Sequence, residues 1–140
     1  MGGNAKNFQF VMTINENEKL RARFPKDIDL EMKPMVPIRQ YPATISRLNL
    51  HAVIVPLQDN LFSNCKSDIK NTETAALGIP TLFSDTTPYK HCADDWFRCA
   101  TPKDFASRLL SIRDWGETRY EETITKNYNK TFNQPIDYFG

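Results

Sequence analysis

The sequence predicts an α/β fold, with a Rossmann-like parallel sheet flanked by helices, and three observations lead to that prediction. An apolar, β-branched run at residues 52–55 stops at Pro56 and has the length of a buried strand. A helical stretch then closes on Gly78, and a second apolar run begins at Ile79. A strand, a helix and a strand in this order form a βαβ crossover, so the two strands are expected to be parallel.

The elements before this unit are expected to be short. Residues 8–14 alternate well enough for a strand, and Asn15 is expected to cap a short helix that ends at Pro25. Residues 27–34 are polar and ambiguous. The prolines beside residues 35–38 limit any strand there to a short piece.

The segments on either side of the βαβ unit complete its expected surroundings. Residues 41–48 suit a helix with Pro42 in its first turn, which precedes the strand at residues 52–55 that we expect at the centre of the sheet. Residues 86–95 form a polar loop, and residues 96–100 are expected to add a small strand.

Two helices are expected to close the fold. Residues 102–115 are amphipathic, with Thr101 as the N-cap, and Gly116 ends that helix. Residues 117–132 form a second, more polar helix. Its apolar residues recur every four positions and predict one narrow packing stripe, made of Tyr120, Ile124, Tyr128 and Phe132.

Composition indicates a folded chain of about one domain. The 140 residues are 40% hydrophobic, which suffices for a packed core over residues 8–134. Residues 1–7 are expected to be disordered or vector-derived, and residues 135–140 to form an irregular tail. A net charge of +1 gives no reason to expect nucleic acid as a partner, and no apolar run is long enough for a transmembrane segment. Three cysteines without a zinc spacing, and no signal peptide, favour the cytoplasm.

Three side chains that suit an anion gather where the central helix is expected to start. Lys66, Ser67 and Lys70 follow the carboxyl end of the first strand, where loops and helix N-termini present N–H groups to a crevice. Glu73 shares a stripe with the two lysines if the helix begins near Ser67. Such a stripe suits a ligand with phosphate and hydroxyl groups. The alternative is a solvated helix face, with Ser67 as a simple N-cap and an ion pair worth about 0.2–0.5 kcal/mol.

Further candidates follow the second strand of the unit. Ser84 and Asp85 end that strand, and Tyr89 lies in the next loop, so all three belong to the edge where a crevice is expected. His91 is a weaker candidate in the same loop. The alternative is turn chemistry, in which Asp85 bonds to the loop backbone and Pro88 fixes a turn.

These residues resemble a known family. The motif Lys-Ser-x-x-Lys-x-x-Glu runs from Lys66 to Glu73, Ala-Ala-Leu-Gly-Ile-Pro ends at Pro80, and Ser-Asp-x-x-Pro-Tyr ends at Tyr89. The pattern resembles the C-terminal, nucleotide-sugar-binding domain of GT-B-fold glycosyltransferases of the group 1 type. The resemblance covers residues 41–132.

The resemblance implies roles for individual residues. The Glu at the position of Glu73 binds the ribose hydroxyls of the donor nucleotide, and groups at the helix start face the diphosphate or the sugar. Many members carry a second Glu eight positions earlier, where this sequence has Cys65. The expected donor-binding residues are Lys66, Ser67, Lys70, Glu73, Ser84, Asp85 and Tyr89.

The resemblance also implies an activity and a partner. The chain would be one half of a GT-B fold and part of a hexosyltransferase-type enzyme, with a nucleotide-sugar as substrate and no metal or other cofactor. The acceptor site would lie on a missing N-terminal domain, so the isolated domain is expected to be inactive, and no catalytic residue is assigned. The alternative is a non-catalytic nucleotide-binding regulatory or interaction domain.

Overall fold

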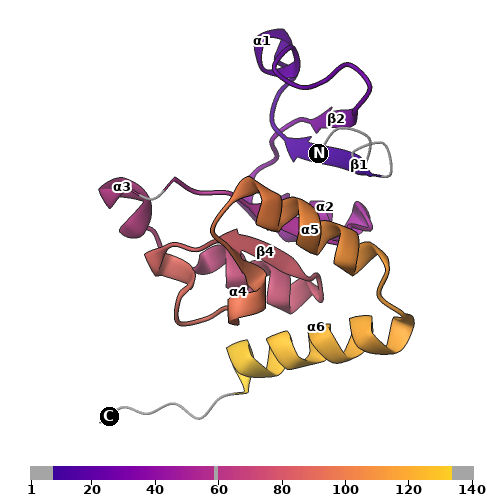
Figure 1. Cartoon of the computed structure of the whole chain (residues 1–140). Helices are drawn as coiled ribbons and strands as arrows, with labels where there is room; N and C mark the ends of the chain where they lie inside the picture. The colour runs from indigo at the N-terminus through magenta and orange to yellow at the C-terminus, as the bar shows by residue number, and fades with distance from the viewer. Residues whose placement is uncertain (1–7, 59, 134–140) are drawn as a thin grey trace. The chain divides into compact units, whose positions relative to one another are not determined.

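The computed structural model describes residues 8–58 and 60–133 (Figure 1). It divides the chain into two compact units, residues 1–44 and residues 45–140, whereas one domain is expected over residues 8–134. Each unit builds its own sheet. The expectations for residues 1–7 and 135–140 lie outside the described residues.

The first unit contains a two-stranded parallel sheet. Strand β1 (Gln9–Thr13) confirms the strand expected at residues 8–14, and it pairs with β2 (Asp29–Lys33). The segment of β2 is ambiguous in sequence because charged residues alternate with Leu30 and Met32. Those two side chains are buried in the structure, so β2 is a half-buried strand.

Two details of the first unit correct the sequence analysis. The helix α1 (Glu18–Arg21) is capped by Asn17 and not by Asn15, because the Asn17 side chain accepts a hydrogen bond from the Leu20 amide at 3.0 Å. Residues 35–38 form no strand, and the 3₁₀ helix η2 (Ile38–Gln40) follows Pro37. Proline has no N–H to donate to a ladder, which accounts for the missing strand.

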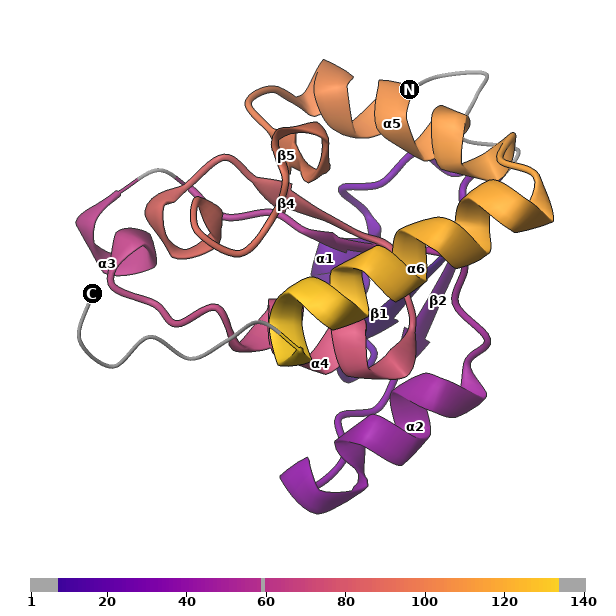
Figure 2. The same ribbon diagram turned by 90° about the horizontal axis from the view of Figure 1, so that it is seen from below.

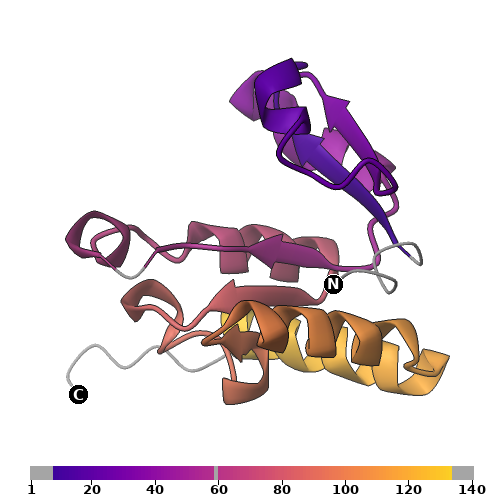
Figure 3. The same ribbon diagram turned by 45° about the horizontal axis from the view of Figure 1, so that its top comes forward.

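The second unit confirms the βαβ crossover. Strands β3 (Val53–Val55), β4 (Thr81–Ser84) and β5 (Arg98–Cys99) are all parallel, in the order β3-β4-β5. Figure 3 shows β3 and β4 as adjacent arrows that point the same way. The sequence analysis places the strand at residues 52–55 at the centre of the sheet, and this prediction is wrong. The strand, β3, lies at the edge of the described sheet. Among the described strands β3 pairs only with β4, and Ile54 on β3 is 40% exposed.

The helices between residues 41 and 77 largely follow the sequence. Helix α2 (Tyr41–Arg47) confirms the expected helix with Pro42 in its first turn. Helix α4 (Ile69–Leu77) ends at Gly78, as predicted, but its N-cap residue is Asp68 and not Ser67. Ahead of it, the short helix α3 (Leu61–Asn64) is capped by Asn60, a feature that the sequence analysis missed.

The last two helices begin where they are expected to begin. Helix α5 (Pro102–Arg113) carries a capping box in which Thr101 and Asp104 bond to each other's backbone amides. Helix α6 (Glu117–Phe132) lies alongside α4 (Figure 2). Its predicted packing stripe is only half correct, because the last two of its four apolar residues, Tyr128 and Phe132, are 44% and 42% exposed.

The core of the second unit is built on β4. All four residues of β4 are buried, and Leu82 and Phe83 are the most deeply enclosed of them. The loop after β4 contains the 3₁₀ helices η3 (Thr87–Tyr89) and η4 (Asp95–Phe97). The ring of Tyr89 stacks on Phe83 at 4.1 Å, so the core fixes the loop that carries candidate site residues. The fold is therefore α/β and Rossmann-like, with small parallel sheets flanked by helices, as predicted.

Candidate functional site

Ser84 joins the carboxyl ends of two parallel strands. Its side chain is buried at the end of β4 and accepts a hydrogen bond from the amide of Leu57, which follows β3, at 2.7 Å. This bond leaves the hydroxyl proton of Ser84 for a second partner. The residue thus lies at the sheet edge where it was expected, and it holds the two strand ends together.

Lys70 and Glu73 form an ion pair on α4. The Lys70 Nζ lies 3.2 Å from the Glu73 Oε2, and the two side chains are 41% and 31% exposed. This geometry is the i, i+3 pair that the sequence analysis considered as its alternative. Because both side chains reach water, the pair is worth little, on the order of 0.3–0.5 kcal/mol.

Tyr89 lies within electrostatic reach of that ion pair. Burial raises the pKa of its phenol, and the charges of Lys70, Asp68 and Glu73 also act on it. The structure therefore joins two residues that the sequence analysis assigned to one site, Lys70 and Glu73, whereas Tyr89 is buried and stacks on Phe83 in the core.

Lys66 and Ser67 do not lie on the expected helical stripe. Both precede α4, which begins at Ile69, and both are exposed. The ammonium group of Lys66 lies 5.1 Å from the ring centre of Phe62 on α3. The stripe of residues 66, 70 and 73 is therefore wrong at its first member, because Asp68 and not Ser67 precedes the first helical residue.

Asp85 has a basic partner that the sequence analysis missed. Its Oδ1 lies 3.7 Å from the Nη1 of Arg98 on β5, and Arg98 also pairs with Asp95. The Arg98 side chain is only 17% exposed, and its buried Nε atom has no hydrogen-bond partner among the described residues. The Asp85–Arg98 contact could not be predicted from local sequence, because Asp85 follows β4 and Arg98 lies on β5.

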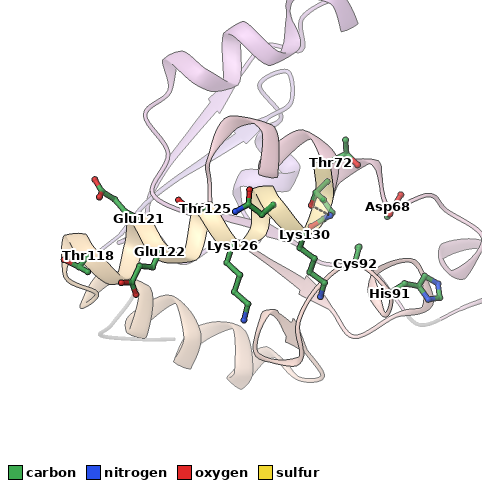
Figure 4. Close-up of a pocket in the computed structure, with 13 residues that line it drawn as sticks. Asp68, Thr72, His91, Cys92, Thr118, Glu121, Glu122, Thr125, Lys126 and Lys130 are labelled. Carbon is green, nitrogen blue, oxygen red and sulfur yellow. Dashed lines mark hydrogen bonds between the residues drawn. The ribbon is translucent and has the colours of Figure 1, made fainter. Parts of the chain in front are cut away.

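A polar groove lies elsewhere in the second unit, with a volume of about 1200 Å³ (Figure 4). One wall is the start of α4 with the turn at His91 and Cys92, and the other is α6, which contributes residues from Thr118 to Thr131. None of the seven predicted donor-binding residues lines this groove; His91 alone was considered as a weaker candidate. Its α6 wall could not be anticipated from motif spacing.

Two groups at the groove have perturbed pKa values. Burial raises the pKa of the Cys92 thiol to about 11, and the negative charge of Asp68 adds to the effect. Next to the groove, the hydrogen bond from Lys130 lowers the pKa of the Asp94 carboxyl, burial acts against it, and Lys126 lowers it further. Cys92 is therefore a protonated thiol at neutral pH, and Asp94 is a carboxylate.

Comparison of the chain with protein-family models, with curated proteins and with solved structures finds no match in any of the three. Across residues 8–58 and 60–133, no group of three or more His, Cys, Asp or Glu side chains is placed to hold a metal ion. No helix in that part of the chain is long and apolar enough to cross a membrane. Arguments about function therefore depend on the motif residues and on their geometry.

Proposed function

We propose that the chain is the donor-binding domain of a hexosyltransferase-type glycosyltransferase, which transfers a sugar from a nucleotide-diphosphate donor. The observation that carries the proposal is the Lys70–Glu73 pair on α4, beside a parallel βαβ unit whose strand ends are tied by Ser84. Ligands of such sheets bind at the carboxyl ends of the strands. A second GT-B domain would carry the acceptor site.

Both residues of this pair have chemistry suited to the donor. The Lys70 ammonium can bind a phosphate oxygen, and the Glu73 carboxylate can accept hydrogen bonds from ribose hydroxyls. Binding would replace the Lys70–Glu73 ion pair, which is partly exposed to water and therefore costs little free energy to break. Asp68 makes no side-chain capping bond to α4, so the N–H groups of its first turn remain suited to an anion. These positive groups supply the charge that a metal would otherwise provide.

Other predicted residues have supporting roles in the proposal. The Ser84 hydroxyl can donate its proton to the donor while it still accepts from Leu57. Asp85 is exposed at the same strand end, where Arg98 compensates its charge. Lys66 and Ser67, being exposed and outside α4, can approach the diphosphate only from the loop. All three cysteines are free thiols, which supports a reducing, cytoplasmic location.

One observation favours a second candidate, a non-catalytic nucleotide-binding regulatory or interaction domain. Cys65, at the position where many members of the resembling family have a Glu near the donor sugar, is exposed at the C-terminal end of α3. A thiol cannot replace the hydrogen-bond acceptors of a carboxylate. Nucleotide binding without sugar transfer would fit this substitution.

A nucleotide titration tests the proposal. Uridine, guanosine and adenosine diphosphates and their sugar conjugates are added to the chain, and backbone chemical shifts are recorded. We expect shifts in α4 and in residues 84–89 with one of the nucleotides, and an affinity about tenfold lower in Glu73→Gln, which corresponds to roughly 1.4 kcal/mol. The matched control is Glu117→Gln, an exposed carboxylate at the start of α6 that does not line the groove.

The outcomes separate the candidates. No response to any nucleotide at millimolar concentration rejects both forms of the proposal. Equal affinity for a nucleoside diphosphate and its sugar conjugates favours the non-catalytic domain, because the sugar then contributes nothing to binding. A response that Glu73→Gln leaves unchanged removes Glu73 from the site.

A further inference from the structure

Helix α6 is held to its unit differently from the helix before it. In α5, Leu109 and Ile112 are buried in the core. No residue of α6 is buried, although the helix is sixteen residues long. Its apolar contacts are limited to half-buried residues such as Ile124, which faces Gly78 at the end of α4. Apolar burial therefore contributes much less to the docking of α6 than to that of α5.

Polar contacts attach α6 along its length. At its start, the Tyr120 hydroxyl donates to the backbone carbonyl of His51 at 2.8 Å. Near its end, the Asn71 side chain on α4 donates to the Thr131 hydroxyl at 3.3 Å. The first turn has no side-chain cap, because its N-cap residue is Gly116. These bonds are neutral, and a neutral hydrogen bond contributes about 1 kcal/mol at most sites.

The charged attachment is concentrated on one carboxylate. Asp94, in the turn before η4, bonds to the Lys130 Nζ at 2.7 Å through Oδ1 and lies 3.3 Å from the Lys126 Nζ through Oδ2. The two lysines are four residues apart and therefore project from the same side of α6. We call these three residues the Asp94 clamp. Figure 4 shows both lysine side chains extending from α6 in the same direction.

Release of α6 would remove one wall of the polar groove. Helix α6 contributes residues from Thr118 to Thr131 to that wall, and α4 with the His91–Cys92 turn forms the other. Without α6, the face of α4 at Asn71, which is half-buried while α6 is docked, would be open to water. The groove therefore exists only while α6 is docked.

We propose that α6 is a detachable helix whose docking is controlled by the Asp94 clamp, so that ionic conditions open and close the polar groove. The helix can detach as a unit, because its own backbone hydrogen bonds are intrahelical while its attachment to the unit is mostly polar. Once detached, a helix of sixteen residues is only marginally stable in water, so its amide hydrogen bonds open and its amides exchange. Segments with few buried apolar contacts open with a smaller free energy than the core. Salt weakens the clamp because it screens pairs that are partly exposed to water.

Hydrogen–deuterium exchange, followed by mass spectrometry at pH 7, tests the proposal. In Asp94→Asn both ion pairs are lost with little change in shape, and we expect the amides of α6 to exchange about fivefold to tenfold faster, while those of β4 and α4 keep their rates. Sodium chloride at about 0.5 M should accelerate α6 in the wild type and have little effect in Asp94→Asn. The matched control is Glu16→Gln, which removes a carboxylate from its pair with Arg21 in the other unit.

A second variant keeps the test valid if Asp94→Asn fails to fold. Lys126→Met changes α6 itself and removes the more exposed of the two ion pairs. It should make the amides of α6 exchange about twofold faster. Unchanged exchange of α6 in both variants overturns the proposal. Equal acceleration of α6, α4 and β4 also overturns it, because Asp94 would then stabilise the whole unit and not the docking of one helix.

Discussion

Replacement of Gly78 by alanine should destabilise the chain through backbone strain and not through a steric clash. Gly78 follows the last residue of α4 with φ +69°, in the left-handed region. Its amide bonds to the carbonyl of Ala75 at 3.2 Å, and the next amide, that of Ile79, bonds to the carbonyl of Thr74 at 3.0 Å. This pair of bonds is a Schellman motif, which requires that conformation.

The magnitude follows from the space around the residue. A Cβ added at Gly78 would lie 3.7 Å from the Cδ1 of Ile124, an ordinary van der Waals contact worth about 0.1–0.2 kcal/mol. The left-handed conformation costs an alanine roughly 1–2 kcal/mol. The cost of the backbone strain therefore exceeds the gain from the new contact. The free energy of unfolding should fall by about 1 kcal/mol or slightly more. For a unit of the size of residues 45–140, which contains Gly78, the melting temperature falls by roughly 4–8 °C per kcal/mol.

Thermal unfolding followed by circular dichroism measures this loss, and two variants control for its cause. Gly116→Ala places a Cβ where no atom lies within 4 Å and the φ of −70° suits any residue, so it should change stability by less than about 0.5 kcal/mol. Gly78→Asn should lose less than Gly78→Ala, because asparagine tolerates the left-handed region. The strain argument is refuted if Gly78→Ala melts within a degree of the wild type, or if Gly116→Ala loses as much.

Two further predictions concern ionisable groups. Since the pKa of Asp94 is lowered in the folded state, its charge contributes stability that is complete above its unfolded pKa of about 3.9 and is lost as the pH falls through the folded value. The difference in melting temperature between wild type and Asp94→Asn should thus be largest near pH 6 and shrink below about pH 4; an equal difference at pH 3 would contradict this. Iodoacetamide at pH 8 should alkylate the exposed Cys65 well before Cys92, whose pKa of about 11 leaves about 0.1% of it as thiolate. Peptide mass mapping measures the two alkylation rates, and equal rates would argue against a buried Cys92 thiol.

Local signals in the sequence were sufficient for most of the second unit. Pro56 and Gly78 bound the strand and helix of the crossover because one residue lacks an N–H and the other accepts a positive φ. Thr101 marked the start of α5 because its hydroxyl can cap that helix. These features depend on a few adjacent residues, so they can be predicted without knowledge of the fold.

Features that depend on tertiary contacts were missed. Strand β2 was ambiguous because charged residues flank Leu30 and Met32, and its partner β1 lies twenty positions earlier in register. The Lys70–Glu73 pair was foreseen because helical spacing alone brings the side chains together. The Asp94–Lys130 bond joins residues 36 positions apart, so no spacing rule indicates it.

The pairing of charges in the second unit bears on where an anionic ligand would bind. The Lys70–Glu73 pair is a partly exposed contact at 3.2 Å, so a diphosphate loses little by displacing the Glu73 carboxylate. In the groove, by contrast, Lys130 and Lys126 share the Asp94 carboxylate, and displacing it would break two contacts and the docking of α6. A diphosphate should therefore prefer the Lys70 side of α4 to the groove. The titration can distinguish the two, because binding at Lys70 shifts residues 84–89 while α6 stays unchanged, whereas binding in the groove shifts α6 first.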